Sequence, residues 1–194
     1  MEITGPAGKL EAALDQAPAE RTITAVLCHP HPLYGGSMHD GVLHAASEVL
    51  LSKGVNCLRF NFRGVGASEG SYDDGVGEVD DALAAITWVR DEYPRDKVWL
   101  VGYSFGAMVT WRATQRTEVE RALLIAPPIG MLDFSGEPNE NLRIHAFAGD
   151  LDDFVDVDRF SARFGDAGHL IEGADHFFSG RHEALIEALA DALD

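Results

Sequence analysis

The chain has 194 residues, of which 46% are hydrophobic, and a formal net charge of −17 from 32 acidic and 15 basic side chains. This length predicts one domain over residues 1–194 with a sizeable core, and the hydrophobic content excludes a disordered chain. The negative charge disfavours nucleic acids and anionic membranes as partners. No apolar run approaches a membrane span and no secretory signal is visible, so we expect a cytoplasmic protein.

The acidic bias has two interpretations, and the sequence leaves both open. An acidic surface keeps proteins of salt-adapted hosts in solution, which would make this a halophilic protein. An ordinary acidic cytoplasmic protein would show the same bias. The sequence is equally compatible with a monomer and a homodimer.

Strands and helices are expected to alternate along most of the chain. Runs of β-branched and apolar residues indicate the strands, and apolar residues at three- and four-residue spacing indicate the helices. The expected strands are residues 1–4, 9–14, 22–28, 55–60, 98–101, 121–126, 142–148 and 169–172. The expected helices are residues 38–53, 77–93, 107–115, 156–164 and 181–193, and loops are expected at 15–20 and 127–141.

The order of these elements predicts the fold class. The first two strands flank Gly5-Pro6-Ala7-Gly8, which is typical of an antiparallel hairpin. The later strands alternate with helices, which is typical of an α/β fold with right-handed crossovers. We therefore expect a three-layer sandwich in which helices cover both faces of a mainly parallel sheet.

Two of the connecting loops have unusual compositions. Residues 29–38 contain two prolines, which exclude regular structure, and two glycines, which permit unusual turns. Residues 61–70 are glycine-rich, but their spacing misses the dinucleotide fingerprint by one residue and no phosphate-binding lysine follows. His29, His31 and His39 lack the spacing of a metal motif, and we expect the first two to be structural. No metal and no cofactor are expected.

A Gly-x-Ser-x-Gly motif at residues 102–106 follows the strand at 98–101 and precedes the helix at 107–115. Strand, motif and helix in this order are the context of a nucleophile elbow, in which the serine occupies a strained turn. The two glycines flank Ser104 because a Cβ at either position would clash with the neighbouring strand and helix. This context predicts serine catalysis. The alternative is a plain strand-to-helix turn whose serine caps the helix.

A serine nucleophile needs a base and a carboxylate that orients the base. In parallel sheets, ligands bind at the carboxyl ends of the strands. His176 follows the last strand and is the expected base. Asp152 lies three residues after the glycine that ends its strand and is the expected acid, with Asp150 and Asp153 as alternatives. The order Ser104, Asp152, His176 is the order along the chain that this elbow-containing fold requires.

The negatively charged oxygen that forms during acyl transfer needs two N–H donors. Phe105 is expected to supply one from its backbone, because it follows the nucleophile and opens the helix. The second is expected from residues 29–38, where the two prolines have no N–H. His31 is the nearest candidate, and Leu33 and Tyr34 are the alternatives.

These motifs together resemble those of the α/β-hydrolase superfamily, and most closely its small capless hydrolases near dienelactone hydrolases and short-chain carboxylesterases. The matching segments, in order, are His-Pro-His-Pro…Gly-Gly at 29–36, Arg-Gly-x-Gly-x-Ser at 63–68, Gly-x-Ser-x-Gly at 102–106, Gly-x-x-Asp-x-x-Val at 149–155 and Ala-Asp-His-Phe-Phe at 174–178. The resemblance implies the fold and the Ser104, Asp152, His176 triad. A serine replaces the cysteine of dienelactone hydrolases, so lactone cleavage is not implied. Only residues 127–141 fill the place where many esterases insert a helical lid, which implies an open, shallow site.

An open site favours small acyl groups over long lipid chains. The apolar residues expected to line the substrate pocket are Leu33, Tyr34, Met131, Phe134, Phe154 and Phe177. The expected function is therefore a serine hydrolase that cleaves small-molecule carboxylic esters or thioesters through an acyl-enzyme. The alternatives are a small peptidase or acyltransferase with the same triad, and a non-catalytic member of the fold that binds a ligand or a protein.

Overall fold

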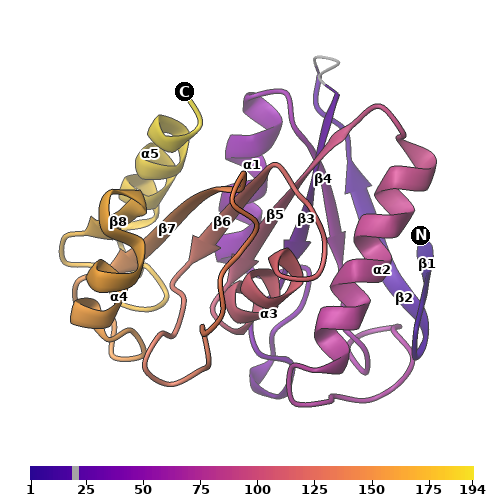
Figure 1. The fold of residues 1–194 in the computed structure, drawn as a ribbon, viewed down its shortest axis with the longest axis horizontal. Helices are drawn as coiled ribbons and strands as arrows, with labels where there is room; N and C mark the ends of the chain where they lie inside the picture. The colour runs from indigo at the N-terminus through magenta and orange to yellow at the C-terminus, as the bar shows by residue number, and fades with distance from the viewer. Residues whose placement is uncertain (19–21) are drawn as a thin grey trace.

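Eight strands form one sheet in the computed structural model, which describes residues 1–18 and 22–194 (Figure 1). The strands are β1 (Glu2–Gly5), β2 (Gly8–Asp15), β3 (Ile23–Cys28), β4 (Asn56–Phe60), β5 (Lys97–Tyr103), β6 (Arg121–Ile125), β7 (Arg143–Gly149) and β8 (Gly168–Ile171). Their order across the sheet is β1-β2-β4-β3-β5-β6-β7-β8. β1 pairs with β2 and β2 with β4 in antiparallel fashion, and all pairs from β4 to β8 are parallel. The sheet confirms the predicted fold class.

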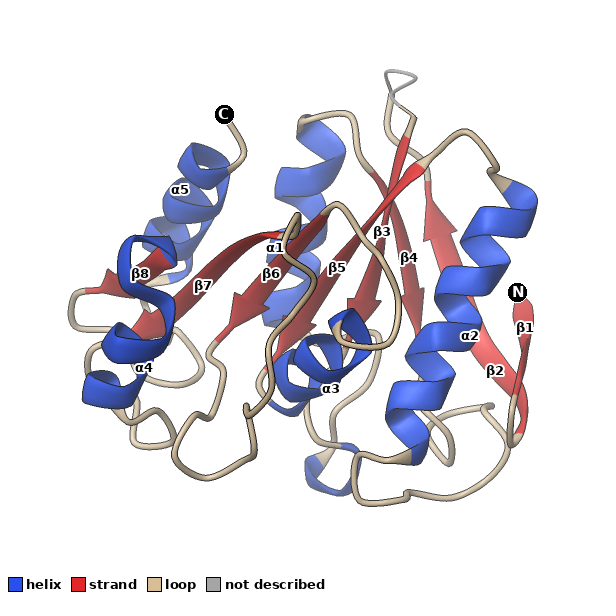
Figure 2. Cartoon of the chain, in the orientation of Figure 1, coloured by secondary structure: helices blue, strands red, loops and turns tan. Residues whose placement is uncertain are grey.

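Helices cover both faces of this sheet. They are α1 (Gly41–Ser52), α2 (Gly77–Glu92), α3 (Phe105–Thr114), α4 (Val157–Phe164) and α5 (His182–Ala192), with short 3-10 helices at Pro32–Tyr34 and Gly165–Ala167. In Figures 1 and 2, α2, α3 and α4 lie in front of the sheet and α1 and α5 behind it, which gives the predicted three layers. Within the described residues, no helix combines the length and the apolar character that crossing a membrane requires.

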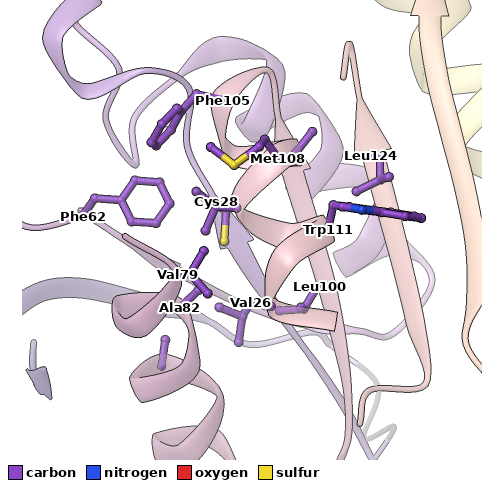
Figure 3. Close-up of a cluster of buried hydrophobic side chains, with 14 of the residues drawn as sticks. Val26, Cys28, Phe62, Val79, Ala82, Leu100, Phe105, Met108, Trp111 and Leu124 are labelled. Atoms are coloured by element: carbon purple, nitrogen blue, oxygen red, sulfur yellow. The ribbon is translucent and has the colours of Figure 1, made fainter. Parts of the chain in front are cut away.

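The central strands build an apolar core on each face of the sheet. Val26 and Leu100 belong to the cluster on the side of α2 and α3, which Figure 3 shows with Val79 beside Val26. The residues that follow them in their strands, Leu27 and Val101, belong to the cluster on the side of α1 and α5. Because successive side chains of a strand point to opposite faces, an unbroken apolar run is what a strand buried on both faces needs.

Helix α1 begins later than the sequence predicts. We expected a helix from residue 38, but its first residue is Gly41. The Asp40 side chain accepts hydrogen bonds from the N–H groups of Val42 and Leu43, at 2.9 and 3.2 Å. An aspartate that satisfies these free N–H groups defines the start of a helix, so the preceding residues form a turn.

The loop at residues 29–38 also differs from its prediction, because it contains a 3-10 turn at Pro32–Tyr34. Proline fits the first position of a helical turn, where its missing N–H needs no acceptor. The ring of His31 accepts the Leu33 N–H at 3.2 Å and caps the turn. Two prolines therefore did not exclude regular structure here.

The two expected loops have different outcomes. Residues 127–141 contain no helix, only an isolated bridge between Ile129 and Leu132, so no lid is inserted before β7. In the loop expected at 15–20, residue 15 is the end of β2, and residues 19–20 lie outside the described residues.

Candidate active site

Ser104 lies in the sharp turn between β5 and α3, at the carboxyl edge of the sheet. Its backbone angles are φ 55° and ψ −118°, a combination that residues other than glycine rarely adopt. The Ser104 N–H donates to the Ile125 carbonyl at 2.8 Å, and the Ser104 carbonyl accepts from the Ala107 N–H at 2.9 Å. These bonds to β6 and to α3 hold the strained turn that the motif predicts.

The two glycines of the elbow motif occupy positions without room for a side chain. A Cβ on Gly102 would lie 2.1 Å from the carbonyl oxygen of Gly106, and a Cβ on Gly106 would lie 2.1 Å from that of Cys28. Each obstacle is a backbone atom, which cannot rotate away as a side chain could. The close approach at Gly106 also brings the end of β3, and the loop that follows it, against the start of α3.

A continuous chain of hydrogen bonds joins the residues predicted as nucleophile, base and acid. His176 Nε2 lies 2.9 Å from Ser104 Oγ, and His176 Nδ1 lies 2.8 Å from Asp152 Oδ2. Because a carboxylate can only accept, Nδ1 carries the proton of the neutral imidazole. Nε2 is then the acceptor that faces the Ser104 hydroxyl, which is the arrangement that activation of a serine requires.

Of the three aspartates predicted as candidates for the acid, Asp152 is the one that contacts the imidazole. Its side chain is fully buried, and its second oxygen accepts the Phe154 N–H at 2.8 Å. Asp150 is exposed, and its carboxylate accepts the Gly173 N–H at 2.6 Å. Asp153 is exposed as well. The geometry therefore favours Asp152 over the two alternatives.

Tyr103 connects the elbow to the histidine loop, a contact that sequence reasoning missed. The buried hydroxyl of Tyr103 donates to the carbonyl oxygen of His176 at 3.0 Å, and the two rings lie 5.6 Å apart. Burial raises the pKa of Tyr103 above its ordinary value, so this hydroxyl keeps its proton. Alternation along β5 places Tyr103 on the α1 and α5 face with Val101, where a buried hydroxyl needs a partner. The need of a buried tyrosine hydroxyl for a hydrogen-bond partner was the signal from which this contact could have been predicted.

The backbone N–H groups predicted to donate to the oxyanion differ in whether they already have a hydrogen-bond acceptor within the protein. Phe105 is the first residue of α3, so its N–H has no acceptor within the helix. In the loop after β3, the N–H groups of Leu33, Tyr34, Gly35 and Gly36 all donate to atoms of the same loop. Within the described residues, the His31 N–H has no hydrogen-bond acceptor. This difference favours His31 over Leu33 and Tyr34 as the second donor.

The side chains of His29 and His31 both stabilise the loops around the site. His29 is fully buried: its Nε2 accepts the Phe62 N–H at 3.0 Å, and its Nδ1 lies 2.7 Å from the Pro30 carbonyl. Burial lowers the pKa of His29 to about 4, so the ring is neutral near pH 7. The ring of His31 packs 4.8 Å from that of Phe105. Across the described residues, no group of three or more His, Cys, Asp or Glu side chains is arranged to hold a metal ion.

The glycine-rich loop at residues 61–70 is held by a buried ion pair. Arg63 donates to both carboxylate oxygens of Asp81 in α2, with Nε at 3.0 Å and Nη2 at 2.8 Å. The Arg63 N–H donates to the same carboxylate at 3.0 Å. A bidentate pair of this kind fixes a loop as well as a charge. The sequence indicated the glycines but not the acid that anchors the arginine.

A cavity of about 590 Å³ opens directly over Ser104 and His176. Its walls are mainly apolar and include Tyr34, Met131, Phe154 and Phe177, four of the six predicted pocket residues. The structure does not bring the other two into the cavity. Leu33 is 66% exposed, and Phe134 is buried in the core, 6.3 Å from the Trp111 ring. Leu33 lies in a single 3-10 turn and Phe134 in an irregular loop, and neither segment has a periodicity that indicates which way a side chain points.

Comparison with known proteins agrees with this fold. A family model described as the alpha/beta hydrolase fold matches residues 33–171, and the chain belongs to this family. A protein of Rickettsia prowazekii described as uncharacterized is 35% identical over 204 residues, covering 97% of this chain and 86% of that protein.

The solved structures that are similar over the whole chain include the following two. One is an alpha-beta serine hydrolase homologue from Coxiella burnetii, with 36% identity, a TM-score of 0.94 and coverage of 100% of this chain and 96% of that one. The other, from Xanthomonas campestris, is described as a serine hydrolase without a lid; it has 38% identity, a TM-score of 0.92 and coverage of 100% and 92%. The chain is thus a small α/β hydrolase of the capless kind.

Proposed function

We propose that this protein is a serine hydrolase that cleaves small carboxylic esters or thioesters through an acyl-enzyme. The observation that carries the proposal is the unbroken hydrogen-bond chain from Ser104 through His176 to Asp152 beneath an open, apolar cavity. The similarity to serine hydrolase homologues supports the same reading.

In the acylation step, Ser104 Oγ attacks the carbonyl carbon of the bound ester while His176 Nε2 takes the hydroxyl proton. Asp152 orients the imidazole and stabilises the positive charge that the ring acquires. The N–H groups of Phe105 and His31 donate to the carbonyl oxygen as it becomes negative. The carbon–oxygen or carbon–sulfur bond then breaks, and His176 returns the proton to the departing alcohol or thiol.

Deacylation repeats these steps with water in the place of the serine. His176 removes a proton from the water, the hydroxide attacks the acyl carbonyl, and Ser104 leaves with the proton that His176 carries. The carboxylic acid is released and the enzyme is restored. The open cavity gives water direct access to the acyl-enzyme, which favours hydrolysis over transfer to a second alcohol or amine.

Labelling with a fluorophosphonate tests this proposal, because such reagents react with activated serines. We expect the wild-type protein to be labelled and to hydrolyse p-nitrophenyl acetate, and we expect the Ser104→Ala variant to do neither. A panel of esters of graded acyl length would then define the chain-length preference, which the lidless cavity predicts to be short.

The alternatives make different predictions in the same experiments. A peptidase or acyltransferase would be labelled at Ser104 but would prefer a peptide substrate or an added acyl acceptor over water. A non-catalytic binding protein would take no label and would cleave none of the esters, which would reject the proposed function.

A further inference from the structure

The charges around the catalytic cavity are asymmetric. Among the described residues that line it, Asp40 is the one carboxylate, and no lysine or arginine is present. Asp40 lies at the start of α1 and is half-buried. A substrate bound over Ser104 therefore meets a fixed negative charge and no fixed positive one.

The carboxylate of Asp40 is only partly compensated by the protein. One oxygen, Oδ1, accepts both N–H groups at the start of α1, from Val42 and Leu43. Within the described residues, Oδ2 has no hydrogen-bond partner. Burial raises the pKa of Asp40, against the opposing effects of these two bonds and of the charge of His182. The carboxylate would therefore gain from a cationic or hydrogen-bond-donating ligand in the cavity.

The charge of Asp40 also reaches the residue beside the nucleophile. Burial is the main cause that raises the pKa of Tyr103, and the charge of Asp40 is the second. Tyr103 precedes Ser104 and lines the same cavity. A substrate group near this part of the floor would therefore experience the negative potential of Asp40.

Aromatic rings provide a second, independent feature that suits a cation. Tyr34, Phe154 and Phe177 line the cavity, and the rings of Phe154 and Phe177 lie 4.6 and 5.4 Å from the ring of His176. Aromatic faces attract ammonium groups, most strongly quaternary ones, because the ring quadrupole is negative above and below its plane. Rings and a carboxylate in one cavity are the chemistry that recognises such groups.

We propose that Asp40 is a specificity-determining residue, through which the enzyme prefers esters or thioesters that carry an ammonium group and rejects those that carry an anion. The inference rests on the proposed hydrolase function and refines its substrate class. It concerns the contact with Asp40 and not the net charge of the protein. The net charge acts over long distances and is screened by salt, whereas a contact inside a cavity is screened much less.

Three thioesters separate the charge of the substrate from its shape. Acetylthiocholine carries a quaternary ammonium, 3,3-dimethylbutyl thioacetate replaces that nitrogen by carbon, and S-acetyl-3-mercaptopropionate carries a carboxylate. Each releases a thiol that a disulfide reagent measures, and Cys28 and Cys57 are buried and do not interfere. We would measure kcat/KM in about 0.5 M NaCl, where the Debye length is on the order of 4 Å.

Two variants each remove one negative charge, one inside the cavity and one outside it. Asp40→Asn keeps an oxygen that can cap α1 but removes the negative charge from the cavity. Asp156→Asn is the matched control, because Asp156 caps α4 by accepting the Arg159 N–H at 3.0 Å and does not line the cavity. Both variants lower the net negative charge by one, so a long-range effect would be the same in both.

We expect the wild type to prefer the ammonium thioester over its neutral counterpart by about five- to tenfold, the range of a partly solvated ion pair with an aromatic contribution. In Asp40→Asn this ratio should fall to within about twofold and the anionic thioester should be cleaved faster, while Asp156→Asn should keep the wild-type ratios.

Equal kcat/KM for the ammonium and neutral thioesters in the wild type, or an unchanged ratio in Asp40→Asn, would overturn the inference. If the inference about Asp40 failed in this way but Ser104 were still needed to cleave the neutral thioester, the proposed hydrolase function would remain supported. If the protein cleaved none of the three and took no fluorophosphonate, the proposed function would fail, and the inference with it.

Discussion

The two halves of the site differ in how they hold their functional side chains. The nucleophile half lies at the centre of the sheet, where backbone atoms pack directly on backbone atoms: Gly106 approaches the carbonyl of Cys28 so closely that no Cβ fits. The acid and base lie in loops after the outer strands β7 and β8. Backbone packing joins these two loops as well, since a Cβ on Gly149 would lie 2.0 Å from the carbonyl oxygen of Ala174. His176 itself is fixed by individual hydrogen bonds, from its ring to Asp152 and from Tyr103 to its carbonyl oxygen.

This difference separates two ways of losing activity. A change in the nucleophile half disturbs backbone packing and should affect folding and catalysis together. A change of Asp152 or Tyr103, the side chains that fix His176, removes individual hydrogen bonds and should affect catalysis with a smaller effect on the fold. The oxyanion loop belongs to the first half, because the contact at Gly106 and the buried ring of His29 hold it.

The largest effect is expected for Gly106→Ala. The new methyl group would lie 2.1 Å from the carbonyl oxygen of Cys28, so β3 and α3 would have to separate. We expect the free energy of unfolding to fall by about 3 kcal/mol or more and the activity to disappear. Gly41→Ala is the control, because a Cβ there meets no atom within 4 Å; its denaturant midpoint should be unchanged or slightly higher. Equal midpoints for the two variants would contradict the packing argument.

Asp152→Asn should next lower kcat, by about 10³- to 10⁴-fold, because an amide cannot hold the imidazole in the productive tautomer. The thermal midpoint should change little by comparison, since the side chain keeps its shape. Asp150→Asn and Asp153→Asn test the alternatives, and we expect their kcat to stay within about threefold of the wild type, since neither carboxylate contacts His176. A larger loss of kcat in either of them than in Asp152→Asn would show that Asp152 is not the acid.

The stability of the nucleophile half should depend on pH through His29. Its pKa is about 4 in the folded protein and about 6.5 in an unfolded chain. Between these values the unfolded state binds more protons, so stability falls as the pH decreases from about 6.5 towards 4. Between pH 7 and about 4.5 the wild type should lose about 2 kcal/mol more than His29→Asn, which does not titrate. His44→Asn, on the exposed surface of α1, should keep the wild-type dependence; a His29→Asn curve parallel to that of the wild type would contradict the prediction.

Tyr103→Phe is expected to have the smallest of these effects, and it tests the hydrogen bond that connects the two halves. The ring remains and only the hydroxyl at 3.0 Å from the His176 carbonyl is lost. We expect kcat to fall about tenfold with KM unchanged, and stability to fall by about 1 kcal/mol. Tyr93→Phe serves as control, since the hydroxyl of Tyr93 makes no hydrogen bond within the described residues. A Tyr103→Phe variant that lost stability but kept kcat would make Tyr103 a purely structural residue.

The sequence predicted best what depends on local pattern and on chain order. The elbow was predictable because strand, glycines and helix are adjacent, and His176 and Asp152 because each follows the end of a strand on the same edge of the sheet. The contact from Tyr103 joins residues 73 positions apart, and its direction depends on how β8 continues into its loop. Phe134 and Met131 lie three residues apart in one irregular loop, yet one is core and the other lines the cavity. No periodicity in the sequence distinguishes them.

The central claim is that Ser104 and His176 act as one unit. Its most direct test is the rate of fluorophosphonate labelling, followed by mass spectrometry, in the wild type and in His176→Ala. We predict a single adduct on the peptide that contains Ser104 in the wild type, and a loss of at least about 10³-fold in labelling rate in His176→Ala. An adduct on another residue, or labelling of His176→Ala at the wild-type rate, would contradict the account.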